Sequence, residues 1–464
     1  MGRARRTVGV VAAVALAVVA VACDPQDPTL TRTDEPVVVT GAQLAPLDGV
    51  PVGEVVAFRW TKAGGWSQVP VQVDERRDVD LGSVYGTAPS GVVVNVYADA
   101  GTYTRADPVV GLDADDEVVV SSGDAGGKPP AFSEPADVVA GSGVDLRLTD
   151  PLAPGEVGHV YLFRSAGGLD PAAGQDRVEY AFDLLAPGSY FNAYRFQDGP
   201  NPEDTWVRTD RYQVHFADRW NVDRVHVVEA GVAGADLVDV RKVQFAPSYC
   251  GRSVASFDDA EGAFVVNRDG PVRALRSYIG ANSGPWTQRT HVFYDDREVV
   301  HTDLRVHAIP SVMDFWDLTT GLDATYRNPA NPGGVAVDGV PDALGAGFPG
   351  WEAVDSPAGS FVAVHEMDSS LSLSPVTYYE DDATAPTTQC TGDADAWGSH
   401  GPYVNQGIAC TDPEDGCSHH LRTTRTVRYG APGVDAATAE AQAAEVTQPL
   451  AVVARPWVEP APGG

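Results

Sequence analysis

A stretch of alternating polar and apolar side chains carries the strongest chemical signal in the sequence. Residues 301–307 read His-Thr-Asp-Leu-Arg-Val-His. Because side chains alternate between the two faces of a β-strand, Leu304 and Val306 take one face and the charged or imidazole side chains take the other. That second face carries His301, Asp303, Arg305 and His307. Such a set can bind an anionic or hydroxylated ligand, and a histidine in it can also serve as a general acid or base.

Two candidate strands just before this stretch carry further basic and aromatic groups. Arg289 and His291 alternate in one of them, and Tyr278 belongs to the other. If the strands are neighbours with matching faces, they form one basic surface on which arginine clamps a carboxylate and an aromatic ring stacks on a sugar. The alternative is a solvent-exposed face on which Asp303 pairs with Arg305. The predicted ligand-binding residues are Tyr278, Arg289, His291, His301, Asp303, Arg305 and His307.

The overall charge makes a local basic surface informative. The chain has 464 residues, with 64 acidic and 32 basic side chains, for a formal net charge of −32. This charge repels phosphate backbones, so we expect no nucleic-acid partner. A patch whose charge opposes that of the whole protein points to an anionic ligand, and we expect a glycan as partner.

An acidic cluster is the one candidate metal site. Asp113, Asp115 and Glu117 follow one another at i, i+2 and i+4, a spacing that oxygen-ligand loops for Ca²⁺ favour. The glycine and distal glutamate of an EF-hand are missing, so the signal is weak, and the other interpretation is a solvated turn. We therefore expect no cofactor, with a structural Ca²⁺ as the alternative.

Other motifs give little support to common enzyme classes. Residues 345–350 match G-x-G-x-x-G, but Pro349 and Gly350 oppose the helix that a dinucleotide site needs. The sequence has no P-loop, no H-E-x-x-H and no G-x-S-x-G.

The N-terminus predicts export. Three arginines precede an apolar run from Val8 to Ala22, which is shorter than a comfortable membrane-spanning helix of about 20 residues. Cys23 follows this run directly, and the segment resembles a bacterial lipoprotein signal in which that cysteine is lipidated. The resemblance implies a cell-membrane lipoprotein that faces the extracellular side or the periplasm. Ala20 and Ala22 also fit an ordinary cleavage site, which would release a soluble protein, and an uncleaved anchor is the third alternative.

The remaining cysteines agree with an oxidising compartment. They are even in number, and none forms a C-x-x-C pair, which argues against zinc. We predict that all four form disulfides, with the connectivity left open. They are Cys250, Cys390, Cys410 and Cys417.

The positions of strand and turn formers predict an all-β fold. Short β-branched or aromatic runs are cut by many of the 48 glycines and 35 prolines. The expected helix begins after Asp435 as N-cap and covers Ala436–Glu445. We predict a smaller N-terminal β-sandwich followed by a larger, many-stranded one. The predicted segments are a signal peptide at 1–22, a tether at 23–36, a first domain at 37–170, a second domain at 177–455 and a disordered tail at 456–464.

Two stretches of the sequence resemble known groups of proteins. Residues 66–75 read W-S-Q-V-P-V-Q-V-D-E and residues 113–117 read D-A-D-D-E. This pair of motifs resembles a pattern of uncharacterised exported bacterial β-proteins and implies no activity. The strand order GPVRALRSYIG, QRTHVFY and TDLRVH within residues 270–307 is loosely similar to the galactose-mutarotase-like and polysaccharide-lyase β-supersandwich proteins. No catalytic motif of those families matches residue by residue.

These observations favour an exported, lipid-anchored surface protein that binds carbohydrate or another envelope component. The alternative is a polysaccharide-active enzyme, lyase-like or epimerase-like, that uses the His/Arg face. The sequence leaves open whether the protein is an enzyme.

Overall fold

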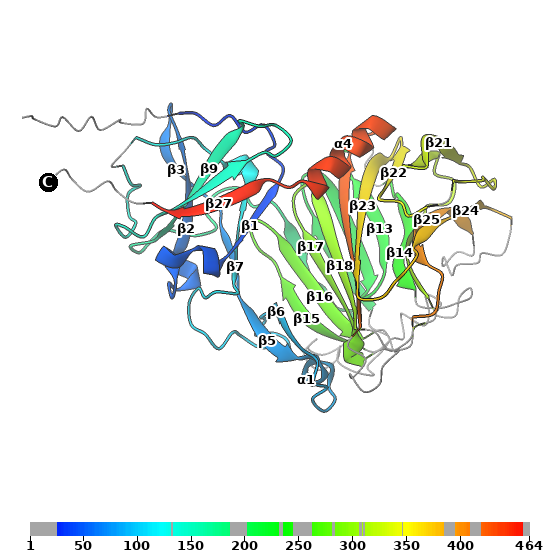
Figure 1. Cartoon of the computed structure of the whole chain (residues 1–464), viewed down its shortest axis with the longest axis horizontal. Coiled ribbons are helices and arrows are strands. Elements are labelled where there is room, and N and C mark those ends of the chain that lie inside the picture. Colours follow the sequence, from blue (N-terminus) through cyan, green and yellow to red (C-terminus); the bar gives the residue numbers. More distant parts are fainter. Residues whose placement is uncertain are drawn as a thin grey trace, which may run out of the picture.

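The structure is a computed structural model, and it confirms the all-β prediction (Figure 1). It describes residues 26–130, 133–185, 202–231, 235–244, 262–280, 284–305, 309, 311–345, 347–384, 395–408 and 419–457. Cys23 and the four predicted disulfide cysteines lie outside these ranges, as does His307. In the part of the chain that is described, no helix has the length and apolar character needed to cross a membrane.

The first β-sandwich packs a three-stranded sheet on a five-stranded sheet. The smaller sheet has the order β1 (Pro36–Thr40), β7 (Glu117–Ser121), β4 (Gln72–Asp74). The larger has the order β27 (Ala451–Pro456), β8 (Val144–Thr149), β9 (Val157–Arg164), β2 (Val55–Thr61), β3 (Gly65–Val69). Inward-facing aliphatic side chains such as Val37, Val118, Leu146 and Val160 form the core between them. This alternation is the period-2 pattern expected of half-buried strands.

The second β-sandwich packs an eight-stranded sheet on a nine-stranded sheet. The eight-stranded order is β10 (Glu179–Ala181), β11 (Pro202–Arg208), β12 (Tyr212–Asp218), β13 (Val222–Val227), β14 (Val238–Gln244), β19 (Val312–Leu318), β25 (Ala396–Val404), β24 (Val376–Asp382). The nine-stranded order is β15 (Gly262–Arg268), β16 (Ala274–Gly280), β17 (Thr287–Phe293), β18 (Arg297–Arg305), β26 (His420–Gly430), β23 (Gly359–Ser369), β22 (Trp351–Ser356), β20 (Ala324–Asn328), β21 (Asn331–Val337). We call the face of the nine-stranded sheet that packs on the eight-stranded sheet its inner face, and the opposite face its outer face.

The predicted C-terminal helix is confirmed as α4 (Ala436–Thr447). Its N-cap is Asp435, whose carboxylate accepts a hydrogen bond from the Thr438 backbone N–H at 2.8 Å. Ala439 and Ala443 face β22 and β23 and join an apolar cluster with Trp351. The helix thus covers part of the outer face at one end of the nine-stranded sheet.

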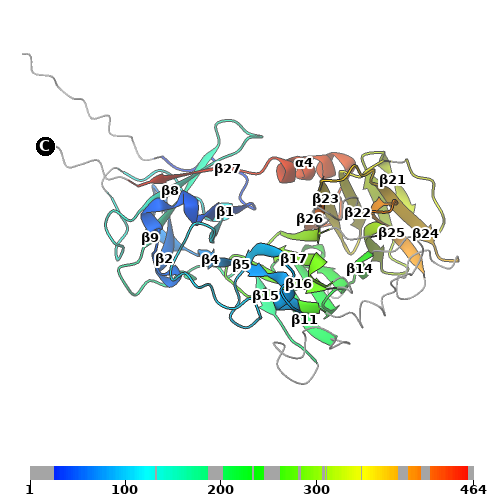
Figure 2. The same cartoon turned by 60° about the horizontal axis from the view of Figure 1, so that its bottom comes forward.

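The chain returns to the first sandwich after α4. β27 pairs antiparallel with β8, from Ala451 opposite Thr149 to Pro456 opposite Val144. The C-terminal strand therefore runs from the second sandwich back to the first, as Figure 2 shows. The predicted boundary at residue 455 falls inside this strand, so the five-stranded sheet takes its edge strand from the end of the predicted second domain. The division into domains remains a prediction.

The two motifs of the first sandwich contact the nine-stranded sheet. The side-chain oxygen of Gln72 accepts hydrogen bonds from the backbone N–H groups of Val272 and Arg273, at 3.2 and 3.0 Å. The Arg273 guanidinium donates to Asp74 at 2.8 Å and to Glu117 at 2.6 Å. These buried, charge-assisted contacts join the V-P-V-Q-V-D-E and D-A-D-D-E segments to β16. These hydrogen bonds and ion pairs therefore hold the two sandwiches in position relative to each other.

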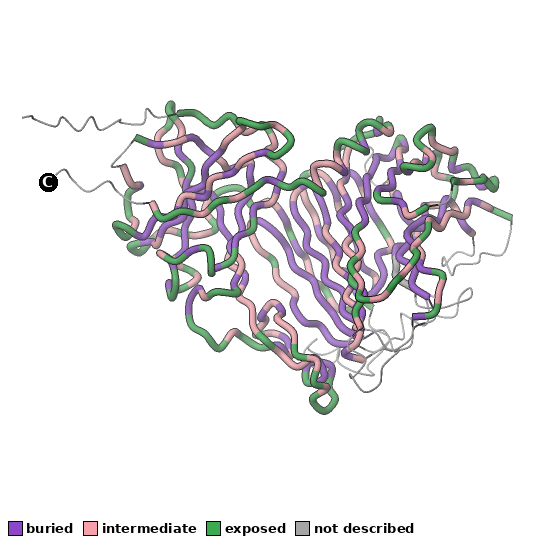
Figure 3. Tube along the Cα trace, in the orientation of Figure 1, coloured by how far each residue is buried: buried purple, intermediate pink, exposed green. Residues whose placement is uncertain are grey.

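A separate two-stranded hairpin, which lies between β4 and β7 in the chain, covers part of the outer face of the nine-stranded sheet (Figure 1). β5 (Arg76–Asp80) pairs with β6 (Val93–Tyr97), and the short helix α1 (Leu81–Tyr85) connects them. Val96 and Leu81 pack with Val265 and Ile279 of the nine-stranded sheet. Every residue of β16 and of β17 is buried, so these strands are covered on both faces (Figure 3). The apolar contact holds the hairpin at one side of the sheet surface.

The motif at residues 66–75 does not form one continuous strand. β3 ends at Val69 and β4 begins at Gln72. Pro70 has no backbone N–H to donate to a sheet ladder, so the chain passes between two sheets at this point.

Candidate functional site

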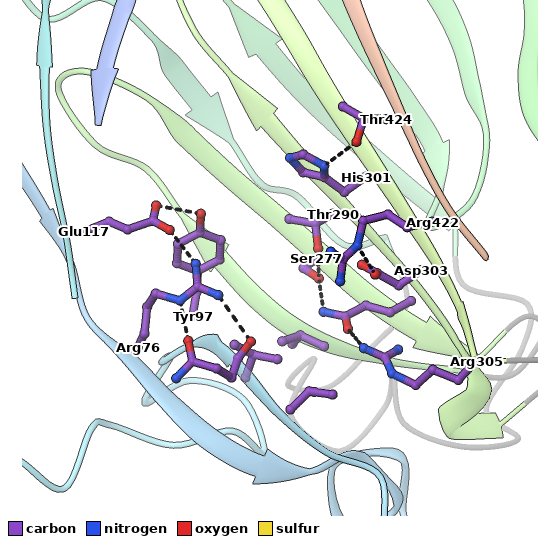
Figure 4. Close-up of a pocket in the computed structure, with 15 residues that line it drawn as sticks. Arg76, Tyr97, Glu117, Ser277, Thr290, His301, Asp303, Arg305, Arg422 and Thr424 are labelled. Carbon is purple, nitrogen blue, oxygen red and sulfur yellow. Dashed lines mark hydrogen bonds and ion pairs between the residues drawn. The ribbon is translucent and has the colours of Figure 1, made fainter. Parts of the chain in front are cut away.

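A cavity of about 680 Å³ lies between the outer face of the nine-stranded sheet and the β5–β6 hairpin. One wall comes from β16, β17, β18 and β26, and the other from β5, β6 and β7 (Figure 4). The volume falls in the range of small-molecule binding sites. Three of the predicted residues line it, and they are His301, Asp303 and Arg305.

Strand register builds the sheet wall from two transverse rows. Thr290, His301 and Thr424 are direct cross-strand neighbours on β17, β18 and β26. The next row holds Gln288, Asp303 and Arg422 in the same order. Neighbouring strands therefore supply a compact polar surface from residues far apart in the sequence.

Hydrogen bonds order this wall. The hydroxyls of Ser277 and Thr290 lie 2.7 Å apart, and the Gln288 amide donates to Ser277 at 3.4 Å. Arg305 donates from one terminal nitrogen to the Gln288 side-chain oxygen at 3.1 Å. Asp303 accepts from Arg422 at 2.6 Å. The result is a chain of fixed hydroxyl, amide and guanidinium groups that faces the cavity.

The opposite wall comes from the β5–β6 hairpin and from β7 of the first sandwich. Arg76 donates to the Asn95 side-chain oxygen at 2.6 Å and pairs with Glu117. The Tyr97 hydroxyl donates to Glu117 at 2.9 Å. Sequence reasoning gave no binding role to Arg76, Asn95 or Tyr97, because the fold alone brings this hairpin to β18. The sequence signal for this wall is limited to a valine-rich run at residues 92–97, which is typical of a β-strand.

Burial sets the protonation of the cavity groups. It lowers the pKa of His301, against the opposing effect of Asp303, so the imidazole is neutral at pH 7. Burial also lowers the pKa of Arg305, which still leaves that side chain charged at neutral pH. The hydrogen bond to Asp303 raises the pKa of Arg422. Burial alone would raise the pKa of Glu117, but Arg273 and Arg76 outweigh it and lower that pKa.

Arg305 differs from the other arginines of the cavity. Arg76 pairs with Glu117, and Arg422 pairs with Asp303. Within the described ranges, Arg305 has no ion pair, and its second terminal nitrogen is buried without a hydrogen-bond partner. This guanidinium is therefore the group best able to take a carboxylate from a ligand.

The prediction of a single basic face is wrong for Tyr278, Arg289 and His291. In the observed register Asp303 lies opposite Gln288, and His301 lies opposite Thr290. This pairing sends Arg289 and His291 to the inner face, where both are buried. The error is one residue of register, which moves every side chain of a strand to the other face.

On the inner face these three residues form part of a buried network. His291 lies 2.8 Å from the Tyr278 hydroxyl through one ring nitrogen and 2.7 Å from Glu298 through the other. Arg289 donates to Asp314 at 3.2 Å. His307 lies outside the described residues, so its predicted place is untested.

The carboxylates of Asp113, Asp115 and Glu117 do not converge on a common point where a cation could bind. Glu117 forms ion pairs with Arg76 and Arg273 and accepts a hydrogen bond from the Tyr97 hydroxyl. Asp115 accepts a hydrogen bond from Asn95. A hydrogen bond to Asp115 and burial raise the pKa of Asp113 to about 6. No group of three metal-binding side chains occurs in the described part of the chain. The Ca²⁺ alternative therefore loses Glu117 as a ligand.

Comparison with known proteins assigns no family. No protein-family model and no curated protein matches the chain. A solved protein of glycosyl hydrolase family 38 from Enterococcus faecalis is similar with a TM-score of 0.45 and 8% identity, over 92% of this chain and 47% of that one. A putative aldose 1-epimerase from Escherichia coli K12 has a TM-score of 0.28 and 9% identity, over 55% of this chain and 100% of that one.

The chain thus spans about half the length of the family 38 protein. Neither likeness is strong enough to carry over an activity or a residue.

Proposed function

We propose that the cavity binds a carbohydrate that carries a carboxylate, and that the protein does so as an exported, lipid-anchored surface protein. The observation that carries the proposal is Arg305, a guanidinium without an ion pair among the described residues, in a cavity of about 680 Å³ lined by hydroxyl and amide groups. A local cation in a chain of net charge −32 favours an anionic ligand.

The hydrogen-bonding groups suit the hydroxyls of a sugar. Ser277, Thr290 and Thr424 each offer a hydroxyl that can donate or accept, and Asn95 adds an amide. Sugar hydroxyls need both functions at once, whereas a lone inorganic anion needs donors only. The mixed wall therefore supports a saccharide rather than a simple anion.

Ring stacking contributes little to this site. Guanidinium groups cover the Tyr97 ring, with Arg76 at 4.7 Å and Arg273 at 5.4 Å from its centroid. Val94 and Val96, which also line the cavity, instead provide the apolar contacts with the ligand. We expect recognition by charge and hydrogen bonds, with affinity that falls as salt rises.

A lyase-like or epimerase-like activity at the same site is the second candidate. It is favoured by His301, a neutral imidazole on the same face of β18 as Arg305. A neutral histidine can take a proton from a sugar carbon while an arginine neutralises the adjacent carboxylate. Incubation with bound glycans, followed by ultraviolet absorbance for unsaturated products and by anomer analysis, tests this candidate.

A glycan array followed by calorimetry tests the binding proposal. Arg305→Met should lower affinity for a uronate-containing oligosaccharide by about tenfold or more, because a charge-assisted hydrogen bond contributes about 1.5–3 kcal/mol. Arg224→Met, which removes an exposed arginine of β13 far from the cavity in sequence, is the matched control. Equal affinity of the two variants would contradict the proposal, as would a preference for neutral over uronate-containing glycans.

The proposed anchoring has its own test. Cys23→Ala should move the protein from the membrane fraction to the medium, because Ala20 and Ala22 still offer an ordinary cleavage site. Mass spectrometry of the mature N-terminus should find an acyl chain on Cys23. Its absence would contradict the lipid anchor and leave the binding proposal intact.

A further inference from the structure

A band of charged side chains divides the core of the second sandwich. On the inner face, the row through Phe293 belongs to one apolar cluster and the row through Leu304 to another. Two rows lie between them. The first runs across five strands and holds Arg276, His291, Val300, Arg425 and His365. The second holds Tyr278, Arg289, Thr302 and Thr423. Burying charges is costly unless each one is paired, so their partners decide what this band requires.

Two parts of the band are paired within the chain. Arg276 donates to both carboxylate oxygens of Glu203, at 2.9 and 3.0 Å. Arg241 forms a two-point pair with Glu298, which also contacts His291. In each case one guanidinium meets one carboxylate.

The third part of the band consists of Arg289, Arg425 and Asp314, and it carries more positive than negative charge. Arg289 and Arg425 share one carboxylate, since Asp314 Oδ1 lies 3.2 Å from Arg289 and 2.8 Å from Arg425. The two donating nitrogens are therefore at most about 6 Å apart. Each arginine is 1% exposed. Among the described residues, Asp314 is the one carboxylate in ion-pair contact with these two arginines, so this buried group of three carries one more positive than negative charge.

In the described part of the chain, four N–H-bearing nitrogens of this pair have no hydrogen-bond partner. They are Nε and Nη1 of Arg289 and Nε and Nη2 of Arg425. The Thr302 hydroxyl, directly opposite Arg289 on the neighbouring strand, is also buried without a partner. Buried donors of this kind cost free energy unless something accepts their hydrogen bonds.

Neighbouring groups compensate only part of the charge. Glu298 contacts Arg241 and His291, and Glu352 contacts His365 and accepts a hydrogen bond from the Tyr326 hydroxyl. Among the described residues, neither carboxylate forms an ion pair with Arg289 or Arg425. The face of Trp316 lies 5.1 Å from the Arg425 guanidinium and contributes a cation–π contact. Burial lowers the pKa of Arg425 to about 10, against the effect of Asp314, so the side chain stays charged at pH 7.

We propose that Arg289 and Arg425 hold a small monovalent inorganic anion, of which chloride is the common example, between the two sheets. One negative charge balances the excess, and an acceptor-only ligand suits a cluster of donors. A compact monovalent ion also loses less hydration free energy on burial than a divalent oxyanion. This site is on the inner face, so it is separate from the carbohydrate cavity and does not depend on it.

Crystals of the full mature protein soaked in bromide give the direct test. Bromide replaces chloride and scatters anomalously, so we expect an anomalous peak within about 3.5 Å of Arg289 and Arg425 nitrogens. The experiment needs no variant and therefore no assumption about folding. An ordered water there, with no anomalous peak at the site, would overturn the proposal.

Thermal unfolding gives an independent test in solution. Chloride should raise the Tm at constant ionic strength, by roughly 2–4 °C for a hundredfold increase, because it binds the folded state alone. Asp314→Asn should strengthen this dependence, since it removes the one carboxylate that competes with chloride. Arg208→Gln, an exposed arginine paired with Glu179, is the matched control and should behave like the parent. A Tm that is independent of chloride in the parent and in Asp314→Asn would count against the anion.

Discussion

The two faces of β17 and β18 carry the same residue types in opposite settings. On the inner face, Arg289 and His291 are buried and contact the carboxylates Asp314 and Glu298. On the outer face, Arg305 and His301 border a cavity and make hydrogen bonds with neutral side chains. Composition does not separate these sets. The face to which a side chain points decides whether it joins the buried ion pairs or borders the cavity.

The same contrast explains what each set can tolerate. A buried ion pair depends on both partners, because removal of one leaves the other charged and desolvated. A partly buried side chain that borders a cavity can be replaced with less loss, because cavity water can take over part of its hydrogen bonding. Paired substitutions, one on each face, can measure this contrast.

The largest expected effect is on stability. Arg276→Met on the inner face should lower the free energy of unfolding by about 3–5 kcal/mol, because Glu203 would remain buried and unpaired. Arg305→Met on the outer face should lower it by less than about 1 kcal/mol. Urea denaturation of both variants measures the difference. Similar losses in the two variants would show that the faces are energetically alike.

The second effect is on the pH dependence of stability. Burial lowers the pKa of His291 to about 3, below the unfolded value of about 6.5, so the unfolded state binds more protons between these pH values. Stability should therefore be lost as pH falls from 6.5. His291→Gln should reduce the loss between pH 7 and 5 by about 2 kcal/mol. His301→Gln should change it less, and denaturation midpoints across this pH range are the measurement.

The third and smaller effect is a gain of ligand affinity, whereas most substitutions in a binding site lower affinity. Asp303→Asn removes a negative charge from the cavity and frees Arg422, so affinity for an anionic glycan should rise by a few-fold. Stability should change by less than about 1 kcal/mol, because the pair with Arg422 is partly exposed. Calorimetry at low and high salt measures the affinity, and urea denaturation measures the stability. A loss of affinity would mean that Asp303 itself binds the sugar.

The smallest effect concerns the acidic cluster. The pKa of Asp113 is raised to about 6, above the usual value near 3.9, so the folded state binds the proton more tightly. Its contribution to stability is present at low pH and is lost as pH rises through 6. Asp113→Asn should thus raise stability above pH 6 by less than about 0.5 kcal/mol. A Ca²⁺-dependent Tm in the parent that this variant abolishes would revive the cation site.

Local patterns predicted the strands and the C-terminal helix well. Alternation within residues 301–305 placed His301, Asp303 and Arg305 on one face, and these residues do border the cavity. The helix after Asp435 was predicted because an N-cap residue and an alanine-rich run are local signals.

Register and long-range pairing could not be predicted in the same way. Both faces of β17 are polar and buried, with Gln288 and Thr290 on one and Arg289 and His291 on the other, so its hydrophobic pattern does not choose between them. The hairpin wall with Arg76 and Tyr97 lies about 200 residues away from β18, and no local property of either segment indicates the other.

The strand β27 also has a consequence for the order of assembly. The five-stranded sheet begins near the N-terminus, but its edge strand occupies Ala451–Pro456. A chain that emerges N-terminus first cannot close this sheet until nearly every other residue has emerged. Pairings this distant in sequence are slow to form, because a large loop must close before they add any stability. The β8 edge must therefore stay unpaired during synthesis until residues 451–456 have been made.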